Sequence, residues 1–283
     1  MITVQQPATS PDVAGHYDDL DVFYRELWGE HVHHGLWHTG DESPEHAAQQ
    51  LLDHVLDHID LADETRVCDV GCGYGATARY LARQYGAQVT ALTLSPAQHD
   101  YAQQVATAGP PPTYLLRDWL ANDLRPDAFD AVLAIESLAH MNDKPRAIAE
   151  AFRVLRPGGR MAACTWLAAE EVSRWSTRYL LEPICTEGRL PSLPTASMYE
   201  KWLRDVGFEI EHIEDLTTRV RRTWTVCIRR LLKALWTNPG YRAFLWNPEE
   251  GNRRFALTML RLWIAYYIGA FRYGLFVARK PRR

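Results

Sequence analysis

The sequence of 283 residues lacks a surplus of positive charge. Its 31 Lys and Arg residues stand against 35 Asp and Glu residues, which gives a formal net charge of -4. Proteins that bind DNA or RNA neutralise phosphates with clustered cations, so this balance disfavours a nucleic-acid partner. The chain is long enough to bury a full hydrophobic core, and we therefore expect a folded rather than a disordered protein.

The sequence also lacks a secretory signal, a regular cysteine framework and a long apolar run. Residues 1–15 have neither the basic start nor the apolar core of a signal peptide. The five cysteines are odd in number and irregular in spacing, so we expect them to stay reduced in a cytoplasmic protein. The apolar run at residues 262–271 is about half of the ~20 residues that cross a bilayer. It predicts a buried helix and no integral membrane segment.

Short apolar strands alternate with amphipathic helices through most of the chain. A helix over 43–61 is expected to begin with Ser43 as its N-cap and Pro44 at its first position. The alternating segments are the strands 66–70, 88–92, 113–116, 130–135 and 160–164 and the helices 76–85, 144–155 and one after Pro96. This alternation predicts an α/β fold, with helices on both faces of a mostly parallel sheet.

The two ends of the chain depart from this alternation. Residues 208–213 and 272–279 are expected to return to the sheet as a final antiparallel pair. Residues 1–42 are predicted to form an N-terminal lid. Residues 43–283 would then form the main domain, with helical cap insertions at about 175–200 and 218–268.

The stretch VCDVGCGYG (67–75) is an apolar strand that ends in Asp69 and is followed by Gly71, Gly73 and Gly75. Such a turn places a ligand at the carboxyl ends of the parallel strands. A dinucleotide site needs G-x-G-x-x-G and an acid about 20 residues later, but here the spacing is G-x-G-x-G and ALTLSPAQ (91–98) has no acid. A P-loop needs Lys-Ser or Lys-Thr after the glycines, and neither follows. The remaining ligand carries a carboxylate, a ribose and an adenine but no phosphate.

These motifs resemble class I S-adenosylmethionine-dependent methyltransferases. The resemblance implies a Rossmann-like fold with a mostly parallel seven-stranded sheet, S-adenosyl-L-methionine as donor and S-adenosyl-L-homocysteine as product. TLSPAQ (93–98) resembles a variant in cyclopropane-fatty-acid-synthase-like and tocopherol methyltransferases, and RDWL (117–120) falls where the fold presents an acid and an apolar side chain to the adenine. The donor-binding residues implied in this way are Asp69, Gly71, Gly73, Gly75, Thr93, Leu94, Ser95, Gln98, Asp118 and Trp119.

The N-terminal segment 16–37 is similar to that of the γ-tocopherol C-methyltransferase-like group. The matching residues are Tyr17, Trp28, Gly29, His31, His33, His34 and Gly35, of which Tyr17 and Trp28 are implied to bind the donor. Histidines at 31, 33 and 34 also suggest a metal, but no further cysteine or carboxylate cluster has ligand spacing, and methyl transfer needs no metal. Cys68 and Cys72 likewise lack a second pair for zinc, and we interpret them as small buried side chains. We therefore expect no metal site, and interpret most of these histidines as hydrogen-bonded.

The segment IESLAHMND (135–143) resembles the E-S-x-x-H-M segment of small-molecule methyltransferases. It places Glu136 and His140 at the mouth of the donor cleft. The residues considered as general base are His140, Glu136 and His34, while Glu136 is an equal candidate for binding the amino group of the donor. Cap aromatics are expected mostly to fill the core, with one or two facing the acceptor; they are Trp224, Trp236, Trp246, Trp263, Tyr266 and Tyr267.

The resemblance implies transfer of a methyl group to a small aromatic metabolite, preferentially at an electron-rich ring carbon of a phenol, chromanol or indole. Thr165 stands where sugar O-methyltransferases often have Asp after the fifth strand, which favours the tocopherol-like branch. The alternatives are N- or O-methylation of a small specialised metabolite, or a non-methylating protein that binds S-adenosylmethionine. A cyclopropane-type enzyme acting on lipid is disfavoured because no basic amphipathic membrane face is evident. The chain is expected to be a monomer or a homodimer.

Overall fold

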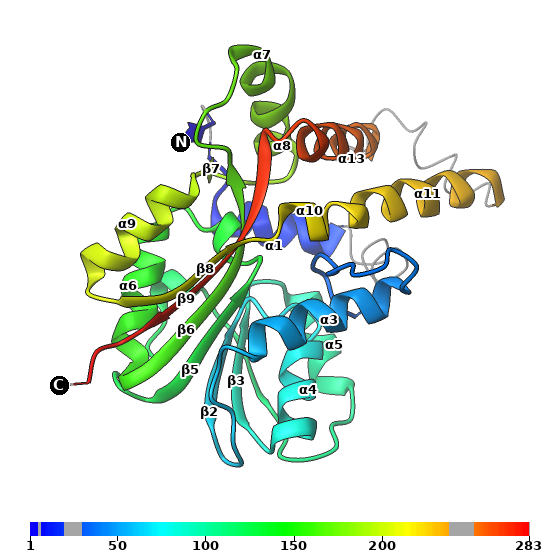
Figure 1. Ribbon diagram of the computed structural model, residues 1–283. Helices are drawn as coiled ribbons and strands as arrows, with labels where there is room; N and C mark the ends of the chain where they lie inside the picture. The colour runs from blue at the N-terminus through cyan, green and yellow to red at the C-terminus, as the bar shows by residue number, and fades with distance from the viewer. Residues whose placement is uncertain (5–6, 20–29, 238–251, 283) are drawn as a thin grey trace.

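A central sheet of seven strands organises the molecule. The computed structural model describes residues 1–4, 7–19, 30–237 and 252–282 (Figure 1). The strands are β2 (Arg66–Val70), β3 (Gln88–Thr93), β4 (Thr113–Leu116), β5 (Phe129–Ile135), β6 (Leu155–Ala168), β8 (Glu209–Asp215) and β9 (Phe271–Arg279). Their order is β4-β3-β2-β5-β6-β9-β8, and β9 is antiparallel to both of its neighbours. The predicted fold class is therefore confirmed, including the final antiparallel pair.

Helices cover both faces of this sheet. Alternate residues of β2 enter opposite cores: Val67 packs with α3 (Pro44–Leu56) and α4 (Ala76–Tyr85), whereas Cys68 packs with α6 (Lys144–Val154) and α9 (Ala196–Val206). A strand buried on both faces reads as a continuous apolar run, which is why the sequence showed it clearly. The fifth helix of this layer structure, α5 (Pro96–Gln104), follows β3.

The ends of α3 illustrate how well local signals fix a helix. Ser43 is the N-cap, and its Oγ accepts a hydrogen bond from the backbone N–H of His46, as expected. The helix ends at Leu56 rather than at residue 61, and the backbone N–H of Asp57 closes its last turn by donating to the carbonyl of Asp53. Ile59 nevertheless remains 7% exposed, so the apolar face continues past the end of the helix.

Further helices lie beyond the carboxyl ends of the strands (Figure 1). They are α1 (Ser10–Asp19), α7 (Arg174–Ser176), the π-helical turn Thr177–Leu181, α8 (Glu182–Glu187), α10 (Thr217–Val220), α11 (Arg222–Thr237) and α13 (Asn252–Tyr267). The last two run side by side, and the indole N–H of Trp263 donates to Thr225 Oγ1 at 3.0 Å. Strand β1 (Ile2–Thr3) pairs antiparallel with β7 (Ser192–Leu193) in a second sheet that the sequence did not indicate.

The C-terminal apolar run forms the buried end of α13 and the start of β9. Leu262, Ala265 and Tyr266 are at most 2% exposed, whereas Tyr267 and Ile268 are 45% and 54% exposed, so the predicted helix is buried on one face only. Within the described ranges, the structure contains no helix with both the length and the apolarity needed to cross a membrane. All five cysteines are free and buried, Cys68 and Cys72 among them, as expected.

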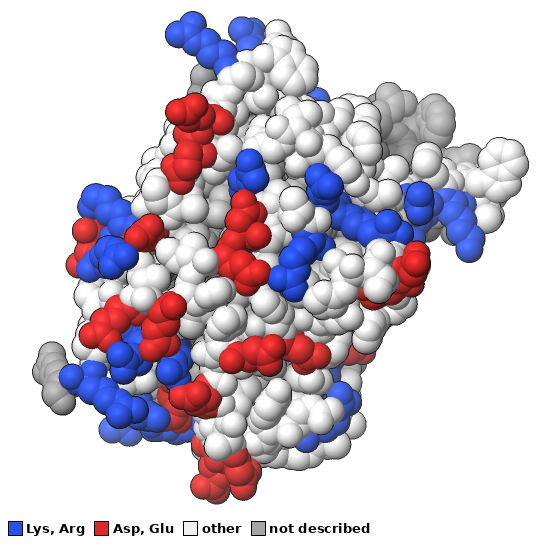
Figure 2. Space-filling model, in the orientation of Figure 1, with Lys and Arg blue, Asp and Glu red and all other residues white. Residues whose placement is uncertain are grey.

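Charges of both signs are interspersed over the sheet edge in the face shown in Figure 2, while Lys and Arg line much of α11. At the sheet edge many of these charges are paired. The Arg279 guanidinium lies 2.7 Å from the Glu209 carboxylate, and that of Arg160 lies 2.6 Å from Glu211. Exposed pairs of this kind contribute little stability each, so they describe the surface rather than explain the fold.

Candidate active site

The glycine turn after β2 is shaped by its neighbours as much as by room for a ligand. Gly71, Gly73 and Gly75 all have positive φ, at +77°, +53° and +77°. A Cβ on Gly71 would clash with Ser137, and one on Gly75 would lie 2.6 Å from the Tyr114 ring. Only Gly73 has no protein atom within 4 Å of such a Cβ, and it lines a cavity. Close approach of a ligand to the backbone therefore explains Gly73, while side-chain packing explains the other two.

Two buried polar atoms beside this turn have no hydrogen-bond partner among the described residues. They are Asp69 Oδ2 and Ser137 Oγ. Burial raises the pKa of the Asp69 carboxyl to about 7. Buried polar atoms are normally paired, because leaving one unpaired costs about 1–3 kcal/mol. Gly71, Gly73 and Ser137 line the cavity beside this turn, whereas Asp69 does not, so Ser137 Oγ is the unpaired atom that a ligand with an amino group would meet there.

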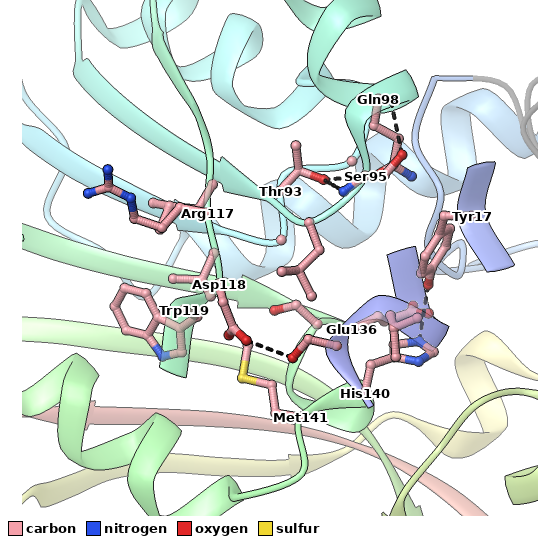
Figure 3. A pocket seen from close by; sticks show the side chains of 18 of the residues that line it. Tyr17, Thr93, Ser95, Gln98, Arg117, Asp118, Trp119, Glu136, His140 and Met141 are labelled. Atoms are coloured by element: carbon pink, nitrogen blue, oxygen red, sulfur yellow. Dashed lines mark hydrogen bonds between the residues drawn. The ribbon is translucent and has the colours of Figure 1, made fainter. Parts of the chain in front are cut away.

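The loops after β3 and β4 complete this cavity (Figure 3). Ser95 is the N-cap of α5: its Oγ accepts from the backbone N–H of Gln98 at 3.1 Å. Thr93 Oγ1 donates to the Gln98 side chain at 2.9 Å, so these residues fix one another. The strand end that has no acid in sequence receives one from α1, because Ser95 Oγ donates to the carboxylate of Asp18. The helix α1 therefore closes over the end of β3.

The wall after β4 is built by Asp118 and Trp119. Asp118 caps the short helix Trp119–Ala121 by accepting the backbone N–H of Leu120 at 2.8 Å, and it also accepts the hydroxyl of Ser10 at 2.6 Å. Trp119 is 4% exposed and donates its indole N–H to the backbone carbonyl of Ala147 at 3.0 Å. Both side chains line the cavity, and the predicted Leu94 does so as well.

A second cavity adjoins the first. The first, which we call the donor cavity, contains about 820 Å³ of empty space out to its opening, and the second, the acceptor cavity, about 690 Å³. Four residues line both: Tyr17, Val32, Glu136 and His140. This shared wall, the junction, is where molecules held in the two cavities would meet. The acceptor cavity is otherwise lined mainly by Trp166, Ile184, Trp224, Met259 and Leu262, with His16, His34 and Glu187.

Glu136 lies at the centre of a hydrogen-bond network at the junction. Its Oε1 accepts the backbone N–H of His34 at 2.6 Å and the hydroxyl of Tyr273 at 2.8 Å, and its Oε2 accepts the indole N–H of Trp166 at 3.0 Å. Burial by itself would raise the pKa of Glu136, but the electrostatic attraction of His34 and the hydrogen bonds from its ring and backbone N–H groups outweigh it and hold the pKa at about 2. Its backbone has φ +62°, a conformation that non-glycine residues adopt at a cost. Glu136 is therefore a fixed anion.

His34 uses both of its ring nitrogens. Its Nε2 lies 2.8 Å from the indole nitrogen of Trp224, which is only a donor, so Nε2 accepts. The proton then sits on Nδ1, which lies 2.9 Å from Glu136 Oε1. The ring is enclosed by the aromatic residues Trp166, Trp224, Tyr266 and Tyr273, with ring centroids 5.0–5.7 Å away. Its lone pair is therefore occupied.

His140 presents a less engaged ring to the junction. Its Nε2 lies 3.1 Å from the hydroxyl of Tyr17, and its Nδ1 lies 3.4 Å from the carbonyl of Arg189 (Figure 3). Burial lowers the pKa of His140 to about 4, so the imidazole is neutral at pH 7. A neutral imidazole keeps one lone pair, which is the requirement for accepting a proton.

The remaining predicted residues fall in several places. Trp28, Gly29 and Trp246 lie outside the described residues. Trp224 lines the acceptor cavity, while Tyr266 is 1% exposed behind it and Trp236 is 87% exposed. We expected Thr165 to follow the fifth strand. It lies instead inside β6 and is fully buried, with its Oγ1 3.4 Å from the hydroxyl of Tyr199. It therefore gives no information on the acceptor.

Sequence reasoning missed several residues that build the site. Trp166 and Tyr273 complete the network around Glu136, and Asp18 supplies the missing acid after β3. Glu187 lines the acceptor cavity and pairs with Arg261. No local pattern in the sequence connects these residues, because Asp18 reaches the site from α1, Trp166 from β6, Glu187 from α8 and Tyr273 from β9.

The sheet order, the glycine turn and the cavity beside it define the class, a Rossmann-like methyltransferase of class I. The family model "Mycolic acid cyclopropane synthetase" matches residues 5–238, and the chain belongs to this family. The chain is 28% identical to tocopherol O-methyltransferase, chloroplastic, of Arabidopsis thaliana, over 99% of this chain and 86% of that protein. It is 32% identical to sarcosine/dimethylglycine N-methyltransferase of Halorhodospira halochloris, over 72% of this chain and 74% of that protein.

A solved structure shows the same fold. The structure of the cyclopropane synthase MmaA2 from Mycobacterium tuberculosis matches with a TM-score of 0.84 at 23% identity, and the match covers 98% of this chain and all of that one. The protein is an S-adenosylmethionine-dependent methyltransferase related to the tocopherol methyltransferases, and S-adenosylhomocysteine is its product.

Proposed function

We propose that this enzyme methylates a small, electron-rich aromatic acceptor, preferentially at a ring carbon. The observation that carries the proposal is the junction: a donor cavity and an aromatic acceptor cavity share one wall made of Tyr17, Val32, Glu136 and His140. Methyl transfer depends mainly on holding two reactants in line at close range, which adjoining cavities accomplish.

The donor cavity offers complementary groups for each part of S-adenosylmethionine, which supplies an electrophilic methyl group when bound. Ser137 Oγ, which is unpaired among the described residues and belongs to the cavity wall, suits its amino group, and the buried Asp69 carboxyl lies behind this wall. The space above Gly73 suits its methionine chain. Ser95 and Gln98 would hold the ribose, with Asp18 orienting Ser95. Asp118 and Trp119 would contact the adenine, and Tyr17 would close the cavity from α1.

The composition of the acceptor cavity supports an aromatic acceptor without negative charge. Among the described residues that line it, none is Lys or Arg, whereas Glu136 and Glu187 contribute carboxylates. An amino-acid acceptor such as sarcosine would need a cation for its carboxylate, because an unpaired buried charge is costly. The indoles of Trp166 and Trp224 instead offer surfaces on which a flat ring can pack.

His140 is the general base that the contacts favour. A phenol or indole in the acceptor cavity becomes more nucleophilic as its proton moves to a base, and the neutral His140 ring faces the junction beside the Tyr17 hydroxyl. His34 is a weaker candidate because its lone pair accepts the indole N–H of Trp224, which cannot rotate away, whereas the partner of His140 Nε2 is the Tyr17 hydroxyl, which can turn. Glu136, with a pKa of about 2, is better suited to hold His34 and to stabilise positive charge at the junction than to remove a proton.

N-methylation and O-methylation are the nearest alternatives, since the relatives include both a sarcosine/dimethylglycine N-methyltransferase and a tocopherol O-methyltransferase. The deciding experiment incubates the enzyme with methyl-labelled S-adenosylmethionine and a panel of phenols, indoles, chromanols, hydroquinones and amines. Mass spectrometry detects label transfer, and NMR identifies the labelled atom. Label on a ring carbon supports the proposal, while label only on nitrogen or oxygen overturns the preference for carbon. Donor binding without any product would instead favour a non-methylating role.

A further inference from the structure

A histidine cluster lies outside both cavities, between α3 and the edge strand β8. His54 is on the last turns of α3 and His58 follows one turn later, so both project toward the same side. On β8, His212 and Glu214 are two residues apart and therefore share one face of the strand. None of these four residues lines the donor or the acceptor cavity.

The contacts in this cluster converge on one carboxylate oxygen. His54 Nε2 lies 2.7 Å and His212 Nε2 lies 3.2 Å from Glu214 Oε2. The ring of His58 stacks on that of His212 with centroids 4.4 Å apart, and it lies 5.7 Å from the ring of His54. In His54, His58 and Glu214, one ligand-capable atom of each lies within 4.8 Å of the other two.

We propose that His54, His58 and Glu214 bind a divalent ion of the zinc type, with water at the remaining position. Two imidazoles and one carboxylate are a donor set that Zn²⁺, Co²⁺ and Ni²⁺ accept, whereas Mg²⁺ and Ca²⁺ require oxygen donors. Tetrahedral zinc at ~2.1 Å from its ligands holds them about 3.4 Å apart. His54 Nε2 and Glu214 Oε2 are closer than this, at 2.7 Å, so these two side chains have to separate slightly while the His58 ring moves inward.

The surroundings of the cluster orient the carboxylate for this role. Arg219 holds the other oxygen, Glu214 Oε1, at 2.9 Å, which leaves Oε2 directed at the histidines. Asp57 also acts on His58, and its negative charge favours a cation. His54 and Glu214 are 22% and 26% exposed, so an ion can enter from solvent.

An ion at this site would join two elements that are 160 residues apart in the sequence. A ligand that binds only the folded chain stabilises it in proportion to the logarithm of its concentration. The bound ion would thus tie the helix that begins the main domain to the last edge of the sheet. The reaction at the junction would proceed without it.

The test uses the full-length chain without an affinity tag, stripped with a chelator. We expect ZnCl₂ at ~100-fold above its dissociation constant to raise the melting temperature by about 5 °C, while MgCl₂ does not. Titration calorimetry should give one ion per chain, and Co²⁺ should give the visible absorption of a low-coordinate site. The variants His58→Gln and His54→Gln should each lose the shift, whereas His46→Gln, at an exposed histidine of the same helix, should keep it.

Two outcomes would overturn the proposal. One is the absence of any Zn²⁺-dependent shift in the wild-type chain. The other is an equal shift and stoichiometry in the wild type and in both cluster variants, which would place zinc on other side chains. Far-UV circular dichroism checks that both variants fold. Methyl transfer should be unchanged in them, because neither residue lines a cavity.

Discussion

Replacing Asp69 by Asn should make the protein without donor more stable at high pH and weaken its binding of donor. Asp69 is 3% exposed, and within the part of the chain that the structure describes its Oδ2 has no hydrogen-bond partner. Burial raises the pKa of its carboxyl from 3.8 to about 7. The folded chain therefore holds this proton more tightly than the unfolded chain does.

The sign and size of the effect follow from this difference. Between pH 4 and pH 7 the folded state binds more protons than the unfolded state, so Asp69 lowers the free energy of unfolding as the pH rises. About three pKa units at ~1.4 kcal/mol each amount to a cost on the order of 4 kcal/mol above pH 7. Asparagine has nearly the same shape and no charge to bury, so it should recover most of that cost.

The assay is urea unfolding of the wild type and Asp69→Asn from pH 4.5 to 8.5, with calorimetry of S-adenosylhomocysteine binding at pH 8. Other titrating groups are common to both chains and cancel in the difference between the two unfolding free energies. We expect this difference to rise with pH in favour of Asn while the affinity for S-adenosylhomocysteine falls. A difference that stays flat with pH, or an Asn variant less stable at pH 8, would refute the assignment of a costly buried carboxylate.

Three other predictions test the junction and the glycine turn. His140→Ala should lower turnover by about 100-fold or more with S-adenosylhomocysteine affinity retained. Because the pKa of His140 is held near 4, the acid limb of the wild-type pH–rate profile should lie near pH 4. A limb near pH 6.5 would show that another group acts as the base. Glu136→Gln should cost about 3 kcal/mol in urea unfolding, since an amide N–H₂ would face N–H and O–H donors, and an unchanged midpoint would contradict this. Gly75→Ala should lower the melting temperature through its clash with Tyr114. Gly73→Ala should lose only about 1–2 kcal/mol of stability yet bind donor poorly. Equal effects of the two variants on stability and on donor binding would contradict the separate roles of the two glycines.

The donor side of the site could be predicted largely from the sequence. Asp69 and the three glycines lie close together in the sequence, and TLSPAQ (93–98) begins at the end of the next strand. Their positions relative to these two strands already place them at one end of the sheet. The structure brings Gly73, Thr93, Leu94, Ser95, Gln98, Asp118 and Trp119 to one cavity together with Tyr17. The reason is topological: strand ends in a parallel sheet lie side by side, so residues that follow consecutive strands converge.

The roles at the junction could not be predicted in this way. The sequence offered His140 and Glu136 as candidates for a base, with His34 next, and only their hydrogen-bond partners separate them. Trp224, which donates to His34 Nε2, lies 190 residues after His34 in the sequence. Tyr273, which donates to Glu136 Oε1, lies 137 residues after Glu136. No local pattern connects positions so distant, so the protonation and availability of these groups depend on tertiary contacts.

The sequence by itself determined the sheet, the donor loop and the class of reaction, because periodicity, caps and a compact glycine motif act over a few residues. The acceptor cavity, the carboxylate that α1 brings to β3 and the histidine cluster between α3 and β8 were decided by the tertiary structure alone. Each of these sites joins side chains from remote segments, and their distances are set by how the helices pack on the finished sheet.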